Sequence, residues 1–319
     1  MANAVKIVIM SSAAEEGVAA ELAEADVCCA NCGAAEVDDI KLEECDYCDL
    51  VKYCSDKCQE EHQDKHEKEC ENRVQELDEL HDKELFTQPD KTHLGECPIC
   101  FLPMPVDPRK SSFYPCCSEL VCTGCVHANI MANIHDTVKA GSCPFCREPA
   151  VRSDDENHKR AMKRVKANDP VALRNMGARR YYEDDIYAAI EYWTKSAELG
   201  DLSAHYYLGR MYEGEGVEKD DEEAVYHYEK AAIGGHSGAR YNLAVIEEEN
   251  GNSHRAVKHL IIAANLGDED SMKKLWKHYS AGDIAKEELD ATLRTHQAAI
   301  DEMKSEQREV AEGSRALSS

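Results

Sequence analysis

The strongest pattern of apolar and polar positions lies in the C-terminal half of the chain, where it repeats every 32 to 35 residues. Within each unit, the apolar or small positions fall at i, i+4, i+7 and i+8, which is one face of an α-helix. The pattern predicts paired helices that stack into an all-α solenoid of about three and a half repeats over residues 172–280. One set of aligned positions in successive units is Ala172, Ala204, Ala239 and Ser271.

Glycines mark the expected ends of the second helices, at Gly200, Gly235 and Gly267. Glycine takes the left-handed conformation that ends a helix without steric cost. A charged helix from about Ile284 to Glu309 is expected to follow and to cap the stack. This half of the chain is therefore predicted to be helical throughout.

One unit carries a distinctive turn in the stretch LGRMYEGEGVEKDDEEAVYHYEKAAIGGHSGA. Its glycine-rich segment from Gly214 to Val217 is followed by Asp220. This stretch resembles the Sel1-like repeat, a relative of the tetratricopeptide repeat. The resemblance implies a concave surface that binds a peptide or protein. Five aromatic side chains could line that surface or pack between the helices: Tyr206, Tyr207, Tyr212, Tyr226 and Tyr241.

Composition changes near residue 150, where we expect a domain boundary. All 16 cysteines lie between Cys28 and Cys146. The N-terminal apolar run, Ile7 to Met10, is too short for a signal peptide, and no stretch approaches the ~20 apolar residues of a membrane span. We therefore expect an intracellular protein, cytoplasmic or nuclear, whose cysteines bind zinc instead of forming disulfides.

The first group of candidate ligands falls within residues 29–70. A C-x2-C pair on a tight turn places two thiolates on one metal, and an x3 spacing on a helix places two ligands one turn apart. The segment is rich in Glu, Lys and Gln, which predicts short helices. His62 is a rival to His66, but the His-x3-Cys spacing favours His66, and His62 is expected to be a surface residue. Cys28 is a spare thiol or an occasional substitute ligand. The eight candidates are Cys29, Cys32, Cys45, Cys48, Cys54, Cys58, His66 and Cys70.

The gaps from Cys48 to Cys54 and from Cys58 to His66 resemble those of the MYND zinc finger. The resemblance implies that alternate pairs share a metal. One zinc would be held by Cys29, Cys32, Cys54 and Cys58. The other would be held by Cys45, Cys48, His66 and Cys70.

A second group lies between Cys97 and Cys146 and contains eight cysteines. No histidine lies between Cys100 and Cys122, so His127, near the start of a helix expected over residues 127–135, is an alternative eighth ligand. The candidates are Cys97, Cys100, Cys116, Cys117, Cys122, Cys125, Cys143 and Cys146.

The pattern CPIC…CC…CTGC…CPFCREP resembles an all-cysteine RING finger. In that cross-brace, one zinc is held by Cys97, Cys100, Cys122 and Cys125. The second is held by Cys116, Cys117, Cys143 and Cys146. The adjacent pair departs from the usual one-residue spacer, and Glu119 stands where a histidine is expected. Four protein ligands leave no open position, so the four Zn²⁺ expected in the whole chain are structural.

The RING resemblance also implies a docking surface for a ubiquitin-conjugating enzyme. The family uses an apolar residue, a proline and a basic residue, which are Ile99, Pro144 and Arg147 here. Each residue also has a simpler explanation. Ile99 can pack in the small core, Pro144 can form a turn, and Arg147 can be a solvated charge. Asn129 occupies the position where many ligases have a tryptophan, which counts against activity.

Charge and motifs narrow the function further. The net charge of −26 excludes the broad basic face that nucleic acid requires. The one basic run, residues 159–166, is expected to be the solvated face of a linker helix or a patch for an acidic partner. The chain has no phosphate-binding loop, no Gly-x-Ser-x-Gly and no SET-domain motif, so no catalytic residues of its own are assigned.

Together these patterns predict a multidomain protein, with two small zinc-stabilised cross-brace α+β fingers followed by an all-α Sel1-like solenoid. We expect the protein to act as an interaction scaffold whose MYND-type finger and repeats bind peptides or proteins. It acts either as a RING-type ubiquitin ligase whose repeats hold the substrate or as an adaptor without ligase activity. The expected segments are 1–27 (N-terminal tail), 28–71 (MYND-type finger), 72–95 (linker), 96–148 (RING-type finger), 149–169 (basic linker helix), 170–282 (repeats) and 283–319 (capping helix and tail).

Overall fold

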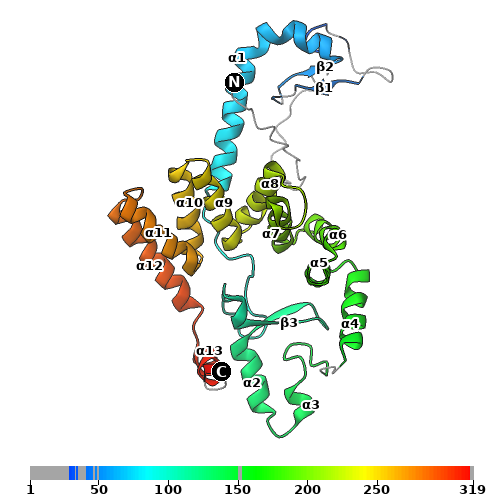
Figure 1. The fold of residues 1–319 in the computed structure, drawn as a ribbon, viewed down its shortest axis with the longest axis vertical. Helices are drawn as coiled ribbons and strands as arrows, with labels where there is room; N and C mark the ends of the chain where they lie inside the picture. The colour runs from blue at the N-terminus through cyan, green and yellow to red at the C-terminus, as the bar shows by residue number, and fades with distance from the viewer. Residues whose placement is uncertain are drawn as a thin grey trace, which may run out of the picture. The chain divides into compact units, whose positions relative to one another are not determined.

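The computed structural model describes residues 29–32, 34, 41–45, 47–48, 50–149 and 153–316. Cys28 and the expected N-terminal tail lie outside the described residues. The chain divides into two compact units, Met1–Glu84 and Leu85–Ser319 (Figure 1). Each unit is described by itself.

The first unit pairs a small sheet with one long helix. Strands β1 (Glu43–Glu44) and β2 (Lys52–Tyr53) are antiparallel, with Glu43 opposite Tyr53. Helix α1 (Asp56–Leu85) then runs for 30 residues, where the sequence predicted short helices. It is continuous because neither glycine nor proline interrupts this charged stretch, whose residue types favour helix. The buried core is small and mostly sulfur: Cys29, Leu42, Cys45, Cys48 and Tyr53.

The second unit begins with a short cysteine-rich module. After the turn η1 (Pro108–Lys110), strands β3 (Ser111–Tyr114) and β4 (Glu119–Cys122) form an antiparallel hairpin. Helices α2 (Thr123–Ala132) and α3 (Thr137–Ala140) follow. Helix α2 begins four residues earlier than the expected helix over residues 127–135, because Cys122 is extended and serves as its N-cap residue.

The rest of the second unit is a stack of antiparallel helix pairs that starts after α4 (Asp154–Lys166). A short wide turn, η2 (Met211–Glu215), follows α7 and ends where Gly214 has a φ of +110°. The paired helices are α5 (Pro170–Tyr182), α6 (Ile186–Glu198), α7 (Leu202–Arg210), α8 (Asp221–Ile233), α9 (Ser237–Glu249), α10 (Ser253–Asn265), α11 (Glu269–Ala281) and α12 (Lys286–Glu302).

The turns between repeats confirm the role predicted for their glycines. Gly200, Gly235 and Gly267 have φ values of +87°, +89° and +90°. An aspartate then caps the next helix in the first and third of these turns. Asp201 accepts a hydrogen bond from the Ala204 amide, and Asp268 accepts one from the Ser271 amide. In the second turn, His236 takes this place, because its Nδ1 accepts a hydrogen bond from the Ala239 amide. Each of the three turns therefore combines a glycine with a side-chain cap of the next helix.

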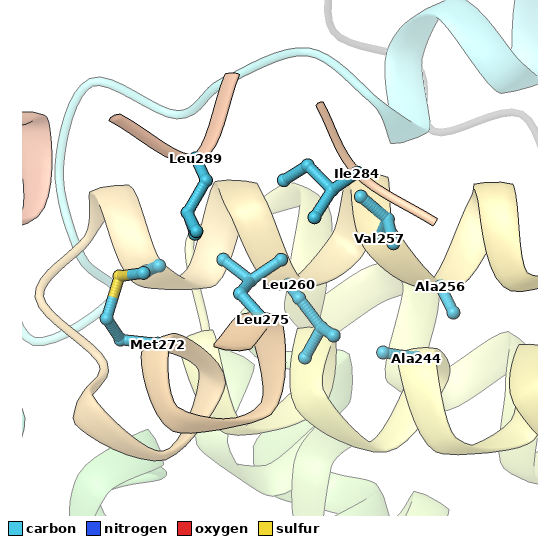
Figure 2. Close-up of a cluster of buried hydrophobic side chains, with 9 residues drawn as sticks. Ala244, Ala256, Val257, Leu260, Met272, Leu275, Ile284 and Leu289 are labelled. Atoms are coloured by element: carbon cyan, nitrogen blue, oxygen red, sulfur yellow. The ribbon is translucent and has the colours of Figure 1, made fainter. Parts of the chain in front are cut away.

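Apolar clusters join each helix pair to the next. Figure 2 shows the cluster at the C-terminal end of the stack, where Leu260, Leu275 and Leu289 come from three successive helices. All three are at most 2% exposed. The five tyrosines considered above are half-buried and pack within this stack; Tyr207, for example, stacks on Trp193 with 5.1 Å between ring centroids.

The C-terminal end differs from the single capping helix expected over residues 284–309. Helix α12 packs on α10 and α11, but it ends at Glu302, with Met303 as its C-cap residue. A separate helix, α13 (Glu306–Ala316), follows. Ser305 starts the new helix, since its hydroxyl accepts a hydrogen bond from the Arg308 amide. Helix α13 packs on α2 of the cysteine-rich module instead of capping the repeats.

The boundary expected near residue 150 is not where the chain divides, because the cysteine-rich module and the repeats form one unit. The basic helix α4 is one connection. Arg164 donates to the Ser118 hydroxyl and to the Cys117 carbonyl. The arginines of the basic run are therefore partly buried against the module, while its lysines remain exposed.

A second connection is the segment that leads from α1 into the module. The buried side chain of Arg240, on α9, donates to the carbonyls of Leu85 and Thr87. Farther along, the His93 amide donates to the Gly235 carbonyl at 3.1 Å. Residues 85–95 are thus held along the repeats and do not form a free linker.

Candidate metal centres

Four groups of cysteine or histidine ligand atoms converge in the described residues. Within each group, all ligand atoms lie within 4.8 Å of one another. The groups use the sixteen candidate residues in the alternate-pair arrangement that the two resemblances imply. Each centre therefore joins two pairs that are distant in sequence.

The first centre joins Cys29, Cys32, Cys54 and Cys58. Cys54 and Cys58 bracket the start of α1, with 3.6 Å between their sulfurs, and Cys32 lies 3.5 Å from Cys54. Cys29 is buried whereas Cys32 is exposed. The start of the long helix is thereby fastened to the segment before the sheet.

The second centre joins Cys45, Cys48, His66 and Cys70. The Nε2 atom of His66 lies 3.2 Å from the Cys48 sulfur, and Cys45 and Cys70 are 3.8 Å apart. The rival histidine has another role, because His62 is hydrogen-bonded to the Tyr53 hydroxyl at 3.1 Å. His62 is half-buried there, and not the surface residue that the sequence indicated.

The third centre joins Cys97, Cys100, Cys122 and Cys125. The first two come from the turn before the hairpin, and the last two from the junction of β4 with α2. The sulfurs of Cys97 and Cys125 are 3.9 Å apart, and those of Cys100 and Cys122 are 3.8 Å apart. This centre is largely buried.

The fourth centre answers whether adjacent cysteines can face one site. Cys116 and Cys117 occupy the tip of the β3–β4 hairpin, where Ser118 takes a φ of +59°. The sulfur of Cys117 lies 3.7 Å from Cys143, and that of Cys116 lies 3.4 Å from Cys146. The tight hairpin turn thus directs neighbouring side chains toward the same pair.

Three side chains near these centres lie outside the four ligand groups. His127, the alternative eighth ligand, is outside the groups and lies 3.3 Å from the Ser314 hydroxyl. Glu119, at the expected histidine position, begins β4. Asn129 donates to the carbonyls of Ala140 and Ser142, just before Cys143. It therefore links α2 to the segment that carries the last cysteine pair.

The geometry of the sulfurs fits zinc. With Zn–S bonds of about 2.3 Å, a tetrahedral site places two sulfurs about 3.8 Å apart. The sulfur–sulfur separations of 3.4 to 3.9 Å lie near that value and far from the ~2.05 Å of a disulfide. All fifteen described cysteines are free thiols.

Electrostatics in the groups also favours a bound cation. Burial and neighbouring thiols raise the pKa of Cys70 and of Cys125 to about 12, whereas a hydrogen bond with Cys122 lowers the pKa of Cys97 to about 4. Four crowded thiolates are unfavourable unless a positive ion offsets them, which Zn²⁺ does. The Nδ1 atom of His66 is buried without a partner, so Nε2, which faces the sulfurs, is the atom available as a ligand.

The three candidate docking residues lie around the turns of the cysteine-rich module. Ile99 is 36% exposed, Pro144 is half-buried, and Arg147 is exposed with a φ of +63°. Phe101 and Phe145 add exposed apolar surface beside these turns. The module therefore carries solvent-accessible apolar and basic groups next to its cysteine pairs.

Comparison with protein families accounts for two parts of the chain. The MYND finger model matches residues 29–70, and the Sel1 repeat model matches residues 170–201, 202–236 and 237–268. The chain carries a MYND finger and three Sel1 repeats. The cysteine-rich module between them lies outside these matches.

Among solved structures, the chain is similar to two bacterial repeat proteins. One is a protective antigen of uropathogenic Escherichia coli with an SLR fold, at 22% identity and a TM-score of 0.41, covering 46% of this chain and 34% of that one. The other is a Sel1 repeat protein from Oxalobacter formigenes, at 26% identity and a TM-score of 0.41, covering 55% of this chain and 71% of that one. This chain thus spans about a third of the length of the first. No curated protein matches the chain.

Among the described helices, none combines the length and the apolar character that crossing a membrane requires.

The sequence missed two features near the centres: the arginine of α4 that holds the hairpin tip, and the C-terminal helix on α2. Neither has a spacing rule that would identify it in advance.

Proposed function

We propose that this protein is a zinc-stabilised interaction scaffold whose cysteine-rich module, residues 96–148, acts as a RING-type ubiquitin ligase. The MYND finger and the Sel1 repeats belong to families that typically bind proteins. The observation that carries the ligase proposal is the interleaving of the third and fourth centres, with Cys97 paired to Cys125 and Cys117 paired to Cys143. In such a cross-brace, successive cysteine pairs alternate between the two centres.

In this mechanism the protein positions the conjugating enzyme and its ubiquitin but supplies no nucleophile. Ile99 and Pro144 present apolar contacts to a ubiquitin-conjugating enzyme. Arg147, exposed and free of an ion pair among the described residues, donates hydrogen bonds across the bound enzyme and its ubiquitin. A planar guanidinium suits this role because it can donate to two acceptors at once. The repeats hold the protein to be modified.

Four structural zinc ions accompany this proposal, two in each cysteine module. Native mass spectrometry of the full chain should find four, and Cys117→Ser should lower the count to three. If the wild type holds only three and Cys117→Ser does not lower that count, the fourth centre and the cross-brace fail together. Zinc at the fourth centre is the condition for the ligase test that follows.

Arg147→Ala tests the ligase directly. We expect it to abolish ubiquitin discharge from a panel of charged conjugating enzymes while leaving the zinc content unchanged. Arg109→Ala, at an exposed arginine of the same module, is the matched control and should retain discharge. If the fully metallated wild type discharges no member of the panel, the alternative holds, namely an adaptor without ligase activity.

A further inference from the structure

The C-terminal helix places a buried arginine against the third centre. Arg308, on α13, is 4% exposed. Its Nη2 atom lies 3.5 Å from the Cys100 sulfur and 3.4 Å from the Leu102 carbonyl. Its Nη1 atom donates to the Pro103 carbonyl at 2.8 Å. One guanidinium therefore spans the turn that follows the first cysteine pair.

The sequence of the module permits this close approach. Gly124 lies inside the third cysteine pair, and a Cβ added there would be only 2.9 Å from the Cγ and backbone nitrogen of Arg308. Any larger residue would push α13 away from the metal-binding turn. The glycine thus leaves room for the backbone of a helix about 180 residues later.

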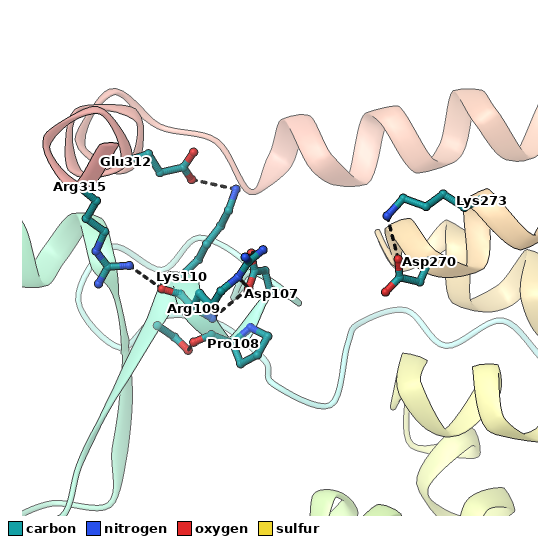
Figure 3. A network of polar contacts seen from close by, with 9 residues as sticks. Asp107, Pro108, Arg109, Lys110, Asp270, Lys273, Glu312 and Arg315 are labelled. Carbon is teal, nitrogen blue, oxygen red and sulfur yellow. Dashed lines mark hydrogen bonds and ion pairs between the residues drawn. The ribbon is translucent and has the colours of Figure 1, made fainter. Parts of the chain in front are cut away.

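Contacts farther along α13 hold it in the same place. Lys110 forms an ion pair with Glu312 at 2.9 Å, and Arg315 donates to the Arg109 carbonyl at 2.6 Å (Figure 3). Ala311, next to Glu312, is only 3% exposed. Contacts of Arg308, Glu312 and Arg315 together hold α13 against the module.

The charge of the third centre explains why an arginine is buried here. Four thiolates with one Zn²⁺ carry a net charge of −2, which is costly to bury. The Arg308 guanidinium donates to the Cys100 sulfur and to backbone carbonyls, and to no carboxylate among the described residues. A buried guanidinium without an anionic partner is also costly. Each charge therefore offsets the other.

We propose that α13 is a structural part of the cysteine-rich module, and that Arg308 supplies the positive charge that stabilises zinc at Cys97, Cys100, Cys122 and Cys125. This inference rests on the zinc content proposed above. Arg308 is a positioning residue, since it donates to a ligand sulfur and holds the turn that carries it. The last turns of the chain thereby determine how firmly a centre some 200 residues earlier retains its metal.

Helix α13 and the segment just before Cys143 pack on different faces of α2. With about 3.6 residues per turn, Gly124 and His127 lie on one face of α2 and Asn129 lies on the nearly opposite face. Helix α13 contacts Gly124 and His127. It therefore supports the module from the side away from Asn129.

The test compares zinc retention at each centre in the full-length, zinc-loaded protein. Wild type, Arg308→Met and Arg308→Lys are challenged with EDTA, alkylated at intervals, and digested for mass spectrometry, so that each cysteine pair reports its own loss of metal. Methionine keeps much of the side-chain volume without charge, and lysine keeps the charge. Arg294→Met, at an exposed arginine of α12, is the matched control.

We expect Arg308→Met to weaken zinc binding at the third centre about 10- to 100-fold, the usual cost of losing a partner of a metal ligand. Arg308→Lys should retain most of the affinity, and Arg294→Met all of it. The MYND centres are an internal control and should not change. Wild-type retention in Arg308→Met, equal loss at every centre, or equal loss in Met and Lys variants overturns the inference. A wild type without zinc at this centre overturns the zinc proposal itself.

Discussion

Replacement of Gly177 by alanine tests how closely the helices of the first repeat approach each other. Gly177 lies on α5, and a Cβ added there would be 2.6 Å from the Cδ1 and Nε1 atoms of Trp193 on α6. Trp193 has little room to move. It is 1% exposed, its Nε1 donates to the Arg174 carbonyl at 3.1 Å, and its ring stacks on Tyr207.

Two opposing contributions set the size of the effect. Forcing a methyl group into a packed interior costs about 1–3 kcal/mol. Alanine gains about 1 kcal/mol over glycine inside a helix. The net loss in the free energy of unfolding for Gly177→Ala is therefore about 0–2 kcal/mol. Gly313→Ala, on α13, meets no atom within 4 Å and should gain up to about 1 kcal/mol.

The difference between the two variants isolates the packing contribution, since helix propensity is common to both. Urea unfolding followed by tryptophan fluorescence measures it, in a Trp276→Phe background so that Trp193 is the only tryptophan. We expect Gly177→Ala to be about 1–3 kcal/mol less stable than Gly313→Ala. If the two glycine variants are equally stable, Trp193 accommodates a methyl group and the argument from close helix contact is wrong.

Three further predictions address the metals, the buried histidines and the segment before the module. Removing zinc with a chelator should expose all cysteines to a thiol reagent, because the core of the first unit is mostly sulfur and depends on the metal. The repeats should keep their helical circular dichroism, and loss of most of the helical signal would contradict this prediction. Burial lowers the pKa of His205 and His227 to about 4. Between that value and the ordinary pKa of about 6.5, the unfolded state binds more protons than the folded state. The free energy of unfolding should therefore fall as the pH is lowered from about 6.5 to about 4. A His205→Gln, His227→Gln double variant should show a shallower fall than the wild type, and an unchanged slope would refute this assignment. Arg240→Met removes the guanidinium that donates to the Leu85 and Thr87 carbonyls, a loss of about 1–3 kcal/mol, so hydrogen exchange of the His93 amide should accelerate roughly 5- to 150-fold. Exchange at the wild-type rate would show that Arg240 does not hold this segment.

Local rules explain what could be predicted from the sequence. The helical period and the glycines after α6, α8 and α10 indicated the repeats, and the family match agrees with them. Ligand spacing selected the same sixteen residues that the structure brings together in four groups. These signals work because helix geometry and metal coordination constrain residues close together in the chain.

The length of α1 and the division of α12 from α13 were not predicted, although both depend on nearby residues. The residue types around the ligands indicated short helices before Cys70, but not that they join into one helix. The absence of glycine and proline from residues 56–85 instead allows one helix to continue. At the other end, Ser305 starts a new helix within a stretch whose charged composition looked uniform.

The sequence by itself thus determined the repeats and the candidate ligands, while only the tertiary structure decided how the cysteine-rich module and the repeats are joined. Arg240 reaches Leu85 across 155 residues of sequence, and Arg308 reaches Cys100 across 208. In the sequence, each of these arginines resembles any charged residue on a helix surface. Their burial depends on which distant carbonyls and sulfurs the folded chain places beside them, and no local period or spacing encodes that arrangement.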